Sequence, residues 1–332
     1  MPTTGSISGI LVEQIIVIFI IILIGVICYK TKLIDDATNS KLSSILLMLI
    51  NPVLIFVSYQ REFSSDLLEG LLISFLLAIT THLVAIAISY LLIRRKKKKT
   101  LIVDGIRIKK YVDNEDVEVE RLSSSYANMG FMGIPLIYGI FGSEGVFYVT
   151  ATVTVFNIFI WTHGVMMMSG SKDLKFKEII RKLTSPTIIA IILGLIFFIL
   201  QIKVPDVVYQ SFSYIGDINT PFAMLIAGVT IGKTNIVQLF TKNLRMYYSV
   251  FLKLLFIPFV LVLLYIWLPI DETVKIIAII LAATPSSTIG VLFTIKYKKN
   301  SVLAAQIFTV TTLLCVVTIP IIIKLAELLA LR

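Results

Sequence analysis

The residues best suited to chemistry lie in one apolar stretch, residues 123–142, which reads SSSYANMGFMGIPLIYGIFG. Asn128 is followed there by Gly130, Gly133 and Pro135. Proline has no N–H to donate and its ring crowds the carbonyl four residues back, so a helix should break or kink here. In hydrocarbon, protein or water must satisfy the backbone groups that such a break frees. The stretch therefore has the features of a half-helix site for an anion or ion, and a Pro-kinked packing helix is the alternative.

A second interrupted stretch lies closer to the C-terminus, where residues 284–290 read TPSSTIG. If breaks at Pro135 and Pro285 meet near a membrane midplane, each new half-helix begins there with free N–H groups and the positive end of its dipole. A carboxylate would be stabilised at this place. Asn128 can offer amide N–H groups from one side. Hydroxyl donors from the other side are Ser286, Ser287 and Thr288. The alternative is that each hydroxyl bonds within its own helix or to a neighbour.

Further residues could support such a site. Close backbone approach is permitted by Gly130, Gly133 and Gly290. Additional polar candidates are Asn51, which could instead cap a kink at Pro52, and Asn157, which could instead bond between helices. Thr220 and Pro221 form a similar polar-Pro pair in a later apolar run. Candidates for binding a proton or cation are Asp217, His82 and His163. For both histidines, an imidazole bonded across helices is the alternative.

These residues need apolar elements to position them, and the composition provides such elements. The chain has 332 residues, of which 57% are hydrophobic and 15% charged, and its mean hydropathy is +0.95. An average soluble domain has about a quarter of its residues charged, so these values indicate a protein that crosses a membrane several times. The net charge of +10 does not indicate nucleic-acid binding, because the basic residues lie between apolar runs.

Apolar runs long enough to cross a membrane need roughly 20 residues. By this measure we predict an all-α integral membrane fold with ten transmembrane helices. The predicted spans are about 10–29, 42–59, 67–93, 122–141, 144–168, 186–202, 210–232, 247–269, 273–294 and 301–325. The first nine residues hold no Lys or Arg, so the basic region of a secretory signal is missing and we expect the first span to be retained.

The loops differ sharply in charge. Most Lys and Arg residues follow the first, third, fifth, seventh and ninth spans, which places the odd-numbered loops in the cytoplasm and both termini outside. We therefore expect a multi-pass protein of the plasma membrane. The basic run Arg94–Lys99 should lie against anionic lipid head groups, with an acidic patch between Asp113 and Glu120.

The polar-Pro pairs and the interrupted stretches fall in the second and fourth spans of each half of the chain. Five spans per half is an odd number, so the second half would be inserted upside down, as an inverted repeat with broken, crossing fourth and ninth helices. The predicted organisation places the first repeat at 1–93 and 122–168, a basic and acidic cytoplasmic loop at 94–121, a cytoplasmic linker at 169–185 and the second repeat at 186–332.

The motif Asn128-x-Gly130-Phe131-x-Gly133-x-Pro135, the Asn51-Pro52 pair and the Pro-interrupted ninth span together resemble the auxin efflux carrier family, over essentially the whole chain. The resemblance implies a scaffold domain and a transport domain with two crossed, broken helices. It also implies transport of organic anions, and it suggests a homodimer. The long hydrophilic central loop of many plant members is absent, so the sequence is similar to the compact bacterial type.

Other functions fit the residues less well. An enzyme would need a nucleophile with a base or a metal-binding set, and the only two histidines lie in different predicted spans. No glycine-rich phosphate loop is present, which disfavours an ATP-driven pump. We expect neither an enzymatic activity nor a cofactor or metal. A receptor or membrane scaffold that transports nothing is the main alternative, and the choice among proton, sodium and membrane potential as driving force stays open.

Overall fold

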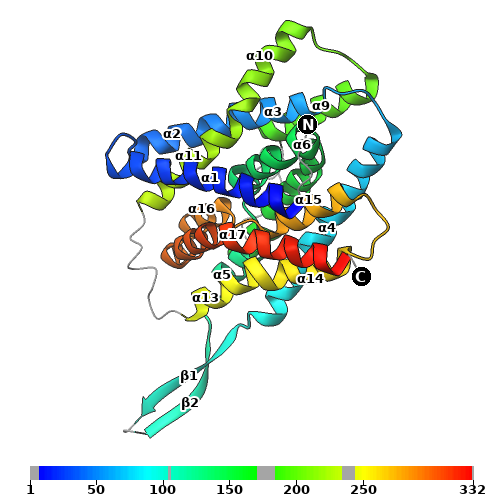
Figure 1. Ribbon diagram of the computed structural model, residues 1–332. Helices are drawn as coiled ribbons and strands as arrows, with labels where there is room; N and C mark the ends of the chain where they lie inside the picture. The colour runs from blue at the N-terminus through cyan, green and yellow to red at the C-terminus, as the bar shows by residue number, and fades with distance from the viewer. Residues whose placement is uncertain (1–6, 104–105, 170–183, 234–243, 331–332) are drawn as a thin grey trace.

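The computed structural model describes residues 7–103, 106–169, 184–233 and 244–330, and Figure 1 traces their course. The α-helices are α1 (Ile7–Lys30), α2 (Asp36–Ile45), α3 (Asn51–Ser58), α4 (Ser65–Leu92), α5 (Val117–Ser125), α6 (Ile134–Phe159), α7 (Val165–Ser169), α9 (Pro186–Leu200), α10 (Asp206–Asp217), α11 (Asn219–Gly232), α13 (Leu244–Phe251), α14 (Ile257–Tyr265), α15 (Glu272–Ala283), α16 (Thr288–Lys296) and α17 (Ser301–Ala330). Short π-helical turns are η1 (Leu46–Ile50), η2 (Met129–Gly133), η3 (Ile160–Gly164) and η4 (Leu252–Phe256).

Within the described residues, seven continuous helical segments are long and apolar enough to cross a membrane. They cover Glu13–Lys30, Asp36–Ser58, Ser65–Leu92, Met129–Ser169, Asp206–Gly232, Arg245–Tyr265 and Ser301–Leu329. Helix α9 is apolar but shorter. The helical character that the composition predicts is therefore confirmed, and these seven segments are candidate membrane spans.

The longest of these segments contains a sharp turn at Gly142. This residue has φ 61° and ψ −153°, a backbone conformation that side chains with a Cβ rarely adopt. The chain folds back on itself there. A contact across the turn shows this, since a Cβ at Gly145 would lie 2.6 Å from Cγ2 of Ile137, eight residues earlier. Helix α6 therefore consists of two helical arms, and its turn lies where the sequence predicts a boundary between two spans.

Three of the four π-helical turns have a common cause. Each ends two residues before a proline, namely Pro52, Pro135 or Pro258. In η2, for example, the N–H of Ile134 donates to the carbonyl of Met129, five residues back. The next N–H in that series would belong to the proline, which has none, so the wider turn accommodates a missing hydrogen bond without ending the helix.

The helices form two packing groups. In the first helix group, α1 packs along α11, and α3 packs on α9 and α10. In the second helix group, α4 to α7 pack with α13 to α17, while α6 contacts α1, α3 and α11 of the first group. A small-residue contact sets the α1–α11 distance, because a Cβ at Gly228 would overlap the carbonyl oxygen of Ile22 and the Cα of Gly25.

Residues 94–121, which we expected as a loop, contain regular structure. Strands β1 (Lys96–Val103) and β2 (Ile106–Asp113) pair in antiparallel register, with Lys96 opposite Asp113, and the hairpin extends away from the helices (Figure 1). The sequence signal is Asp104-Gly105 between two runs with β-branched residues, which is typical of a hairpin. Helix α5 begins at Val117, before the predicted start of the fourth span.

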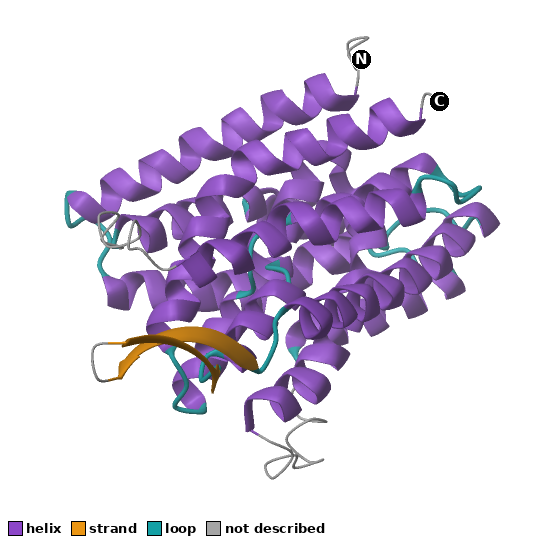
Figure 2. Ribbon diagram, turned by 90° about the horizontal axis from the view of Figure 1, so that it is seen from below, coloured by secondary structure: helices purple, strands orange, loops and turns teal. Residues whose placement is uncertain are grey.

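The two ends of the helix bundle differ. Helix α1 begins and α17 ends at one end, and the hairpin lies toward the other end in both views (Figure 2). The predicted linker 169–185 lies, from residue 170 to 183, outside the described residues.

Candidate functional site

The two interrupted helices cross and pair through their backbones. Ala127 and Ser286 form an antiparallel bridge. The N–H of Asn128 donates to the carbonyl of Pro285 at 2.8 Å, and the N–H of Ser287 donates to the carbonyl of Tyr126 at 3.0 Å. Helices α5 and α15 end at this crossing, and η2 and α16 begin there. The two stretches that the sequence singles out therefore meet.

The position of the first break differs from the prediction. Tyr126 and Asn128 have non-helical backbone angles, whereas Pro135 lies inside the first turn of α6. The wider turn of η2, which precedes Pro135 in one continuous helical segment, accommodates the N–H that a proline lacks. The carbonyl of Gly130, which would pair with residue 135 in the π-helical series, accepts a hydrogen bond from Nδ2 of Asn51 at 3.1 Å. A side chain from a distant helix thus replaces the hydrogen bond that Pro135 cannot make.

Ser286 fastens the crossing from the other side. Its hydroxyl donates to the carbonyl of Ser123 at 2.6 Å, within the last turn of α5. Its N–H donates to Oγ1 of Thr311 on α17 at 3.1 Å. One carbonyl at the end of α5 and the N–H of Ser286 are thereby satisfied, as burial requires. Ser286 is 1% exposed and its hydroxyl is already engaged by Ser123, so it holds the two breaks together.

A cavity of about 520 Å³ lies beside the crossing, between the two helix groups. Of the ten residues that the sequence analysis assigns to substrate binding, four line it: Asn128, Gly130, Ser287 and Thr288. The remaining six are not among its lining residues: Gly133, Pro135, Pro285, Ser286, Asn51 and Asn157. Asn128 is 3% exposed, and within the described residues its side-chain amide makes no hydrogen bond to another group. That amide is therefore available to a ligand in the cavity.

Several cavity residues were missed by the sequence analysis. The polar ones are Ser40, Ser43, Ser44, Thr230, Lys233, Thr309 and Thr312. They lie at helical spacings of three and four in α2, at the C-terminal end of α11 and in α17, which place them on one face of each helix. Such spacings could have suggested three polar faces. Nothing in the spacing indicates that these faces turn toward the crossing. Most of the remaining lining is apolar, including Met129, Phe131, Phe156 and Phe308.

Two helix N-termini and one lysine contribute positive charge around the cavity. Helix α16 begins at Thr288 and η2 begins after Asn128, so the positive ends of two helices face this region. Lys233 lines the cavity near the start of α2 and lies 3.6 Å from Asp36. Negative charge also lies close by, because Asp36 pairs with Lys233 and Asp35 caps α2, where the hydrogen bond from the Thr38 N–H lowers the pKa of the Asp35 carboxyl group.

The helix-break candidates have supporting roles outside the cavity. Asn51 accepts a hydrogen bond from Asn219 while it donates to Gly130, and so it links α3, α11 and η2. Oγ1 of Thr220 donates to the carbonyl of Pro135 at 2.9 Å. Asn157 donates to Val153 in its own helix, not between helices. Prolines 52 and 221 lie in the first turns of α3 and α11, and Gly290 packs against Leu122.

The three coupling candidates also lie away from the cavity lining. The carboxylate of Asp217 accepts a hydrogen bond from the hydroxyl of Tyr138, across the interface between the helix groups. Nδ1 of His82 donates to the Ala78 carbonyl at 2.8 Å, and its ring stacks on Phe159. His163 shares a hydrogen bond of 2.8 Å with the hydroxyl of Tyr126, the residue at the first break.

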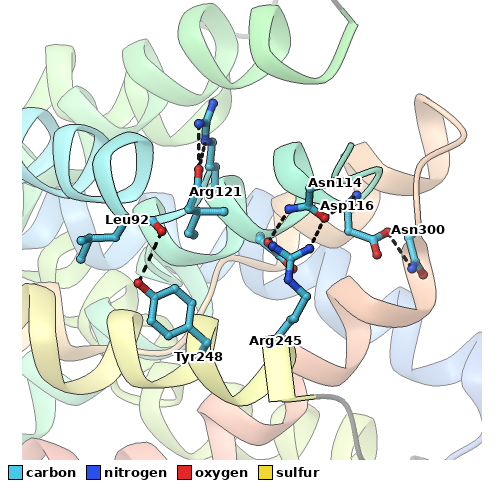
Figure 3. A network of polar contacts seen from close by, with 9 residues as sticks. Leu92, Asn114, Asp116, Arg121, Arg245, Tyr248 and Asn300 are labelled. Atoms are coloured by element: carbon cyan, nitrogen blue, oxygen red, sulfur yellow. Dashed lines mark hydrogen bonds and ion pairs between the residues drawn. The ribbon is translucent and has the colours of Figure 1, made fainter. Parts of the chain in front are cut away.

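A polar network anchors the base of the hairpin (Figure 3). Asn114, just after β2, donates to the buried carboxylate of Glu120 at 3.0 Å and accepts a hydrogen bond from Arg245 of α13. Arg245 and Glu120 also form an ion pair at 3.4 Å. Asn300 donates to Asp116 at 2.9 Å. The hairpin base is thereby tied to the α5 half of the broken helix.

Within the described part of the chain, no group of three or more His, Cys, Asp or Glu side chains is placed to hold a metal ion.

Comparison with known proteins identifies the class of protein to which this chain belongs. An uncharacterized transporter of Methanothermobacter thermautotrophicus is 25% identical over 225 residues, which cover 66% of this chain and 67% of that protein. A family model described as membrane transport protein matches residues 10–323. Since that match takes in both broken helices and every wall of the cavity, the chain belongs to this membrane transport protein family, the auxin efflux carrier family that its motifs resemble.

Proposed function

We propose that this protein is a secondary carrier of small organic anions, of the class of malate-like or auxin-like carboxylates. It would work by alternating access around the crossed helices, without covalent chemistry. Membership of a transporter family supports the general class. The anionic substrate is supported by the site, since neutral donors and helix N-termini stabilise a carboxylate and no acidic side chain lines the cavity within the described residues.

One observation carries the proposal. The free amide of Asn128 and the N-terminal turn of α16 at Thr288 border the same cavity, on opposite sides of the crossing. A carboxylate placed between them would receive hydrogen bonds from both halves of the site. The apolar walls around it would accommodate the carbon skeleton of the substrate.

We extend the proposal to the topology. The full fold would have ten crossings in two inverted five-helix repeats, with the scaffold and transport domains corresponding to the first and second helix groups. Three features support it: the turn at Gly142, the break in α5–η2 and the break in α15–α16. The protein would lie in the plasma membrane with both termini outside, consistent with the basic residues of the odd-numbered loops.

Movement of the second helix group against the first would exchange access between the two faces. Contacts that cross the interface would have to break and re-form, and they include Asn51 to Gly130, Thr220 to Pro135 and Tyr138 to Asp217.

Two further proposals come from the sequence. The basic run Arg94–Lys99 would contact anionic lipid head groups, and two copies of the protein would form a homodimer through the first helix group.

The test is uptake of a panel of labelled mono- and dicarboxylates into vesicles that contain the purified protein, under imposed pH and voltage gradients. Saturable uptake is expected for at least one carboxylate. The Asn128→Ala variant should raise its KM about tenfold or more, because a hydrogen bond to a charged group contributes about 1.5–3 kcal/mol. Asn157→Ala is the matched control, since its amide bonds within its own helix.

Two results would contradict the proposal. If the folded protein moves no carboxylate, a receptor or scaffold becomes the better interpretation. If flux rises linearly with concentration and never saturates, the protein is a channel. Saturable flux that Asn128→Ala leaves unchanged would keep the carrier and remove the binding site from the crossing.

A further inference from the structure

Lys253 is a buried lysine that the proposed anion site does not use. It lies in η4 and is 2% exposed. Its Nζ donates to the carbonyl of Ala282 at 2.8 Å, and no carboxylate in the described part of the chain forms an ion pair with it. Taking an ammonium group out of water costs several kcal/mol unless the protein compensates it. Its position at this carbonyl therefore needs an explanation.

The carbonyl of Ala282 is available because of the break. In an uninterrupted helix it would accept the N–H of residue 286, but the N–H of Ser286 donates to Thr311 instead. Residue 285, the next nearest, is a proline without an N–H. Ala282 lies in the last turn of α15, where the negative end of the helix dipole favours a cation. The ammonium group of Lys253 thus occupies a negative site that the interruption creates.

This is the kind of position where other carriers hold an ion. In transporters with discontinuous helices, unwound carbonyls and the C-terminal ends of half-helices coordinate the coupling cation. We infer that Lys253 is a tethered cation that takes the place of a dissociable coupling cation at the end of α15. The carrier would then complete its cycle without sodium or another transported cation. This inference rests on the proposed carrier function.

The inference predicts how charge moves. The second helix group would carry the Lys253 charge through the cycle. In the loaded state, the charges of the Lys253 ammonium group and of a bound monoanion would sum to zero. The empty state would carry one positive charge. Membrane potential would act chiefly on the return of the empty carrier, since moving one charge through 100 mV changes its free energy by about 2.3 kcal/mol.

The experiment measures uptake of the best carboxylate from the panel in vesicles with equal pH on both sides, in sodium, potassium or N-methylglucamine buffers. Wild-type rates should agree within about twofold among the three buffers, as expected without cation coupling. Lys253→Met should lower the rate in N-methylglucamine by about tenfold or more, and sodium or potassium should partly restore it by entering the vacated carbonyl site. Lys253→Arg, which keeps the charge, should retain more activity than Lys253→Met.

Lys275→Met is the matched control. This lysine also extends to a backbone carbonyl, that of Ile266 at 3.5 Å, but it lies at the opposite end of α15 and is partly exposed. Its replacement should not change the cation dependence. Wild-type uptake that requires sodium or a proton gradient would overturn the inference while leaving the carrier function in place. Wild-type rates for folded Lys253→Met in N-methylglucamine would overturn it as well. Absence of any carboxylate flux would remove the proposed function and this inference together.

Because the buffer comparison needs only the wild-type protein, the inference stays testable even if Lys253→Met fails to fold. Folding of each variant is checked by monodisperse elution and by its thermal unfolding midpoint. Loss of folding in Lys253→Met, together with cation-independent wild-type flux, would still support the inference when Lys253→Arg remains folded and active.

Discussion

The N–H of Asn128 donates to the carbonyl of Pro285 at 2.8 Å, across a sequence separation that spans half the chain. This bond joins the two breaks directly, because the proline in one interruption supplies the acceptor for the N–H of a residue in the other interruption. The paired backbones hold two helix starts and two helix ends in fixed positions. Four half-helix ends therefore meet where neither helix alone could hold an ion.

Ser286→Ala should loosen the crossing. The change removes a hydrogen bond of 2.6 Å and leaves the buried carbonyl of Ser123 without that donor. Comparable bonds between membrane helices contribute about 0.6–1.7 kcal/mol, so we expect a clearly lower thermal midpoint in detergent. Thr80→Ala is the control, because the Thr80 hydroxyl bonds to Leu76 of its own helix at an exposed position. Equal midpoints for both variants would show that Ser286 does not support the crossing.

Asn51→Ala should lower the thermal stability of the protein, because it leaves buried polar groups at η2 and α11 without a partner. The carbonyl of Gly130 and the amide of Asn219 both lose a partner, which costs about 1–3 kcal/mol for each buried group left unpaired. Adding Pro135→Ala in the same chain restores a backbone N–H near the Gly130 carbonyl. The double variant should therefore recover part of the lost thermal stability. If Pro135→Ala gives no recovery, the missing proline N–H is not what Asn51 compensates.

Gly228→Leu should prevent the close packing of α1 on α11. The new side chain would overlap the carbonyl oxygen of Ile22, and overpacking of this kind costs about 1–3 kcal/mol or more when backbone must move. We expect a lower yield of monodisperse protein and a lower thermal midpoint. Gly139→Leu is the control, since a Cβ there meets only Oε1 of Gln14 at 3.6 Å. Similar losses for the two variants would contradict this account of the helix contact.

Lys233→Gln should weaken the capture of an anion at the cavity. Lys233 lines the cavity and is partly exposed, so its field attracts an anion mainly at low ionic strength. We expect the KM for uptake from the Lys233 side to rise about two- to fivefold at low salt, and the difference to shrink near 1 M salt, where the Debye length is about 3 Å. Lys203→Gln is the control, because Lys203 pairs with Glu62 away from this cavity. A rise in KM that salt does not change would point to a direct contact with the substrate.

The sequence by itself identified the family and the apolar, helical character of the chain, since a membrane span requires a long apolar run and a transporter break requires residues that disrupt a helix. Asn128, Pro285 and their neighbours could be selected for the same reason. The sequence also contained the hairpin signal at Asp104-Gly105, which the expectation of a polar loop obscured.

Only the tertiary structure decided which polar residues face the cavity and where the first helix breaks. Pro135 is a strong local signal for a helix break, yet it lies inside a helix. The carbonyl of Gly130, which Pro135 cannot pair with, accepts a hydrogen bond from Asn51, a residue distant in sequence. Ser286 looks like a ligand donor but bonds to Ser123, whereas Ser40 and Thr309 line the cavity from helices without any break. Hydrogen-bond satisfaction inside a membrane is a property of the assembled helices, so spacing along one helix cannot determine it.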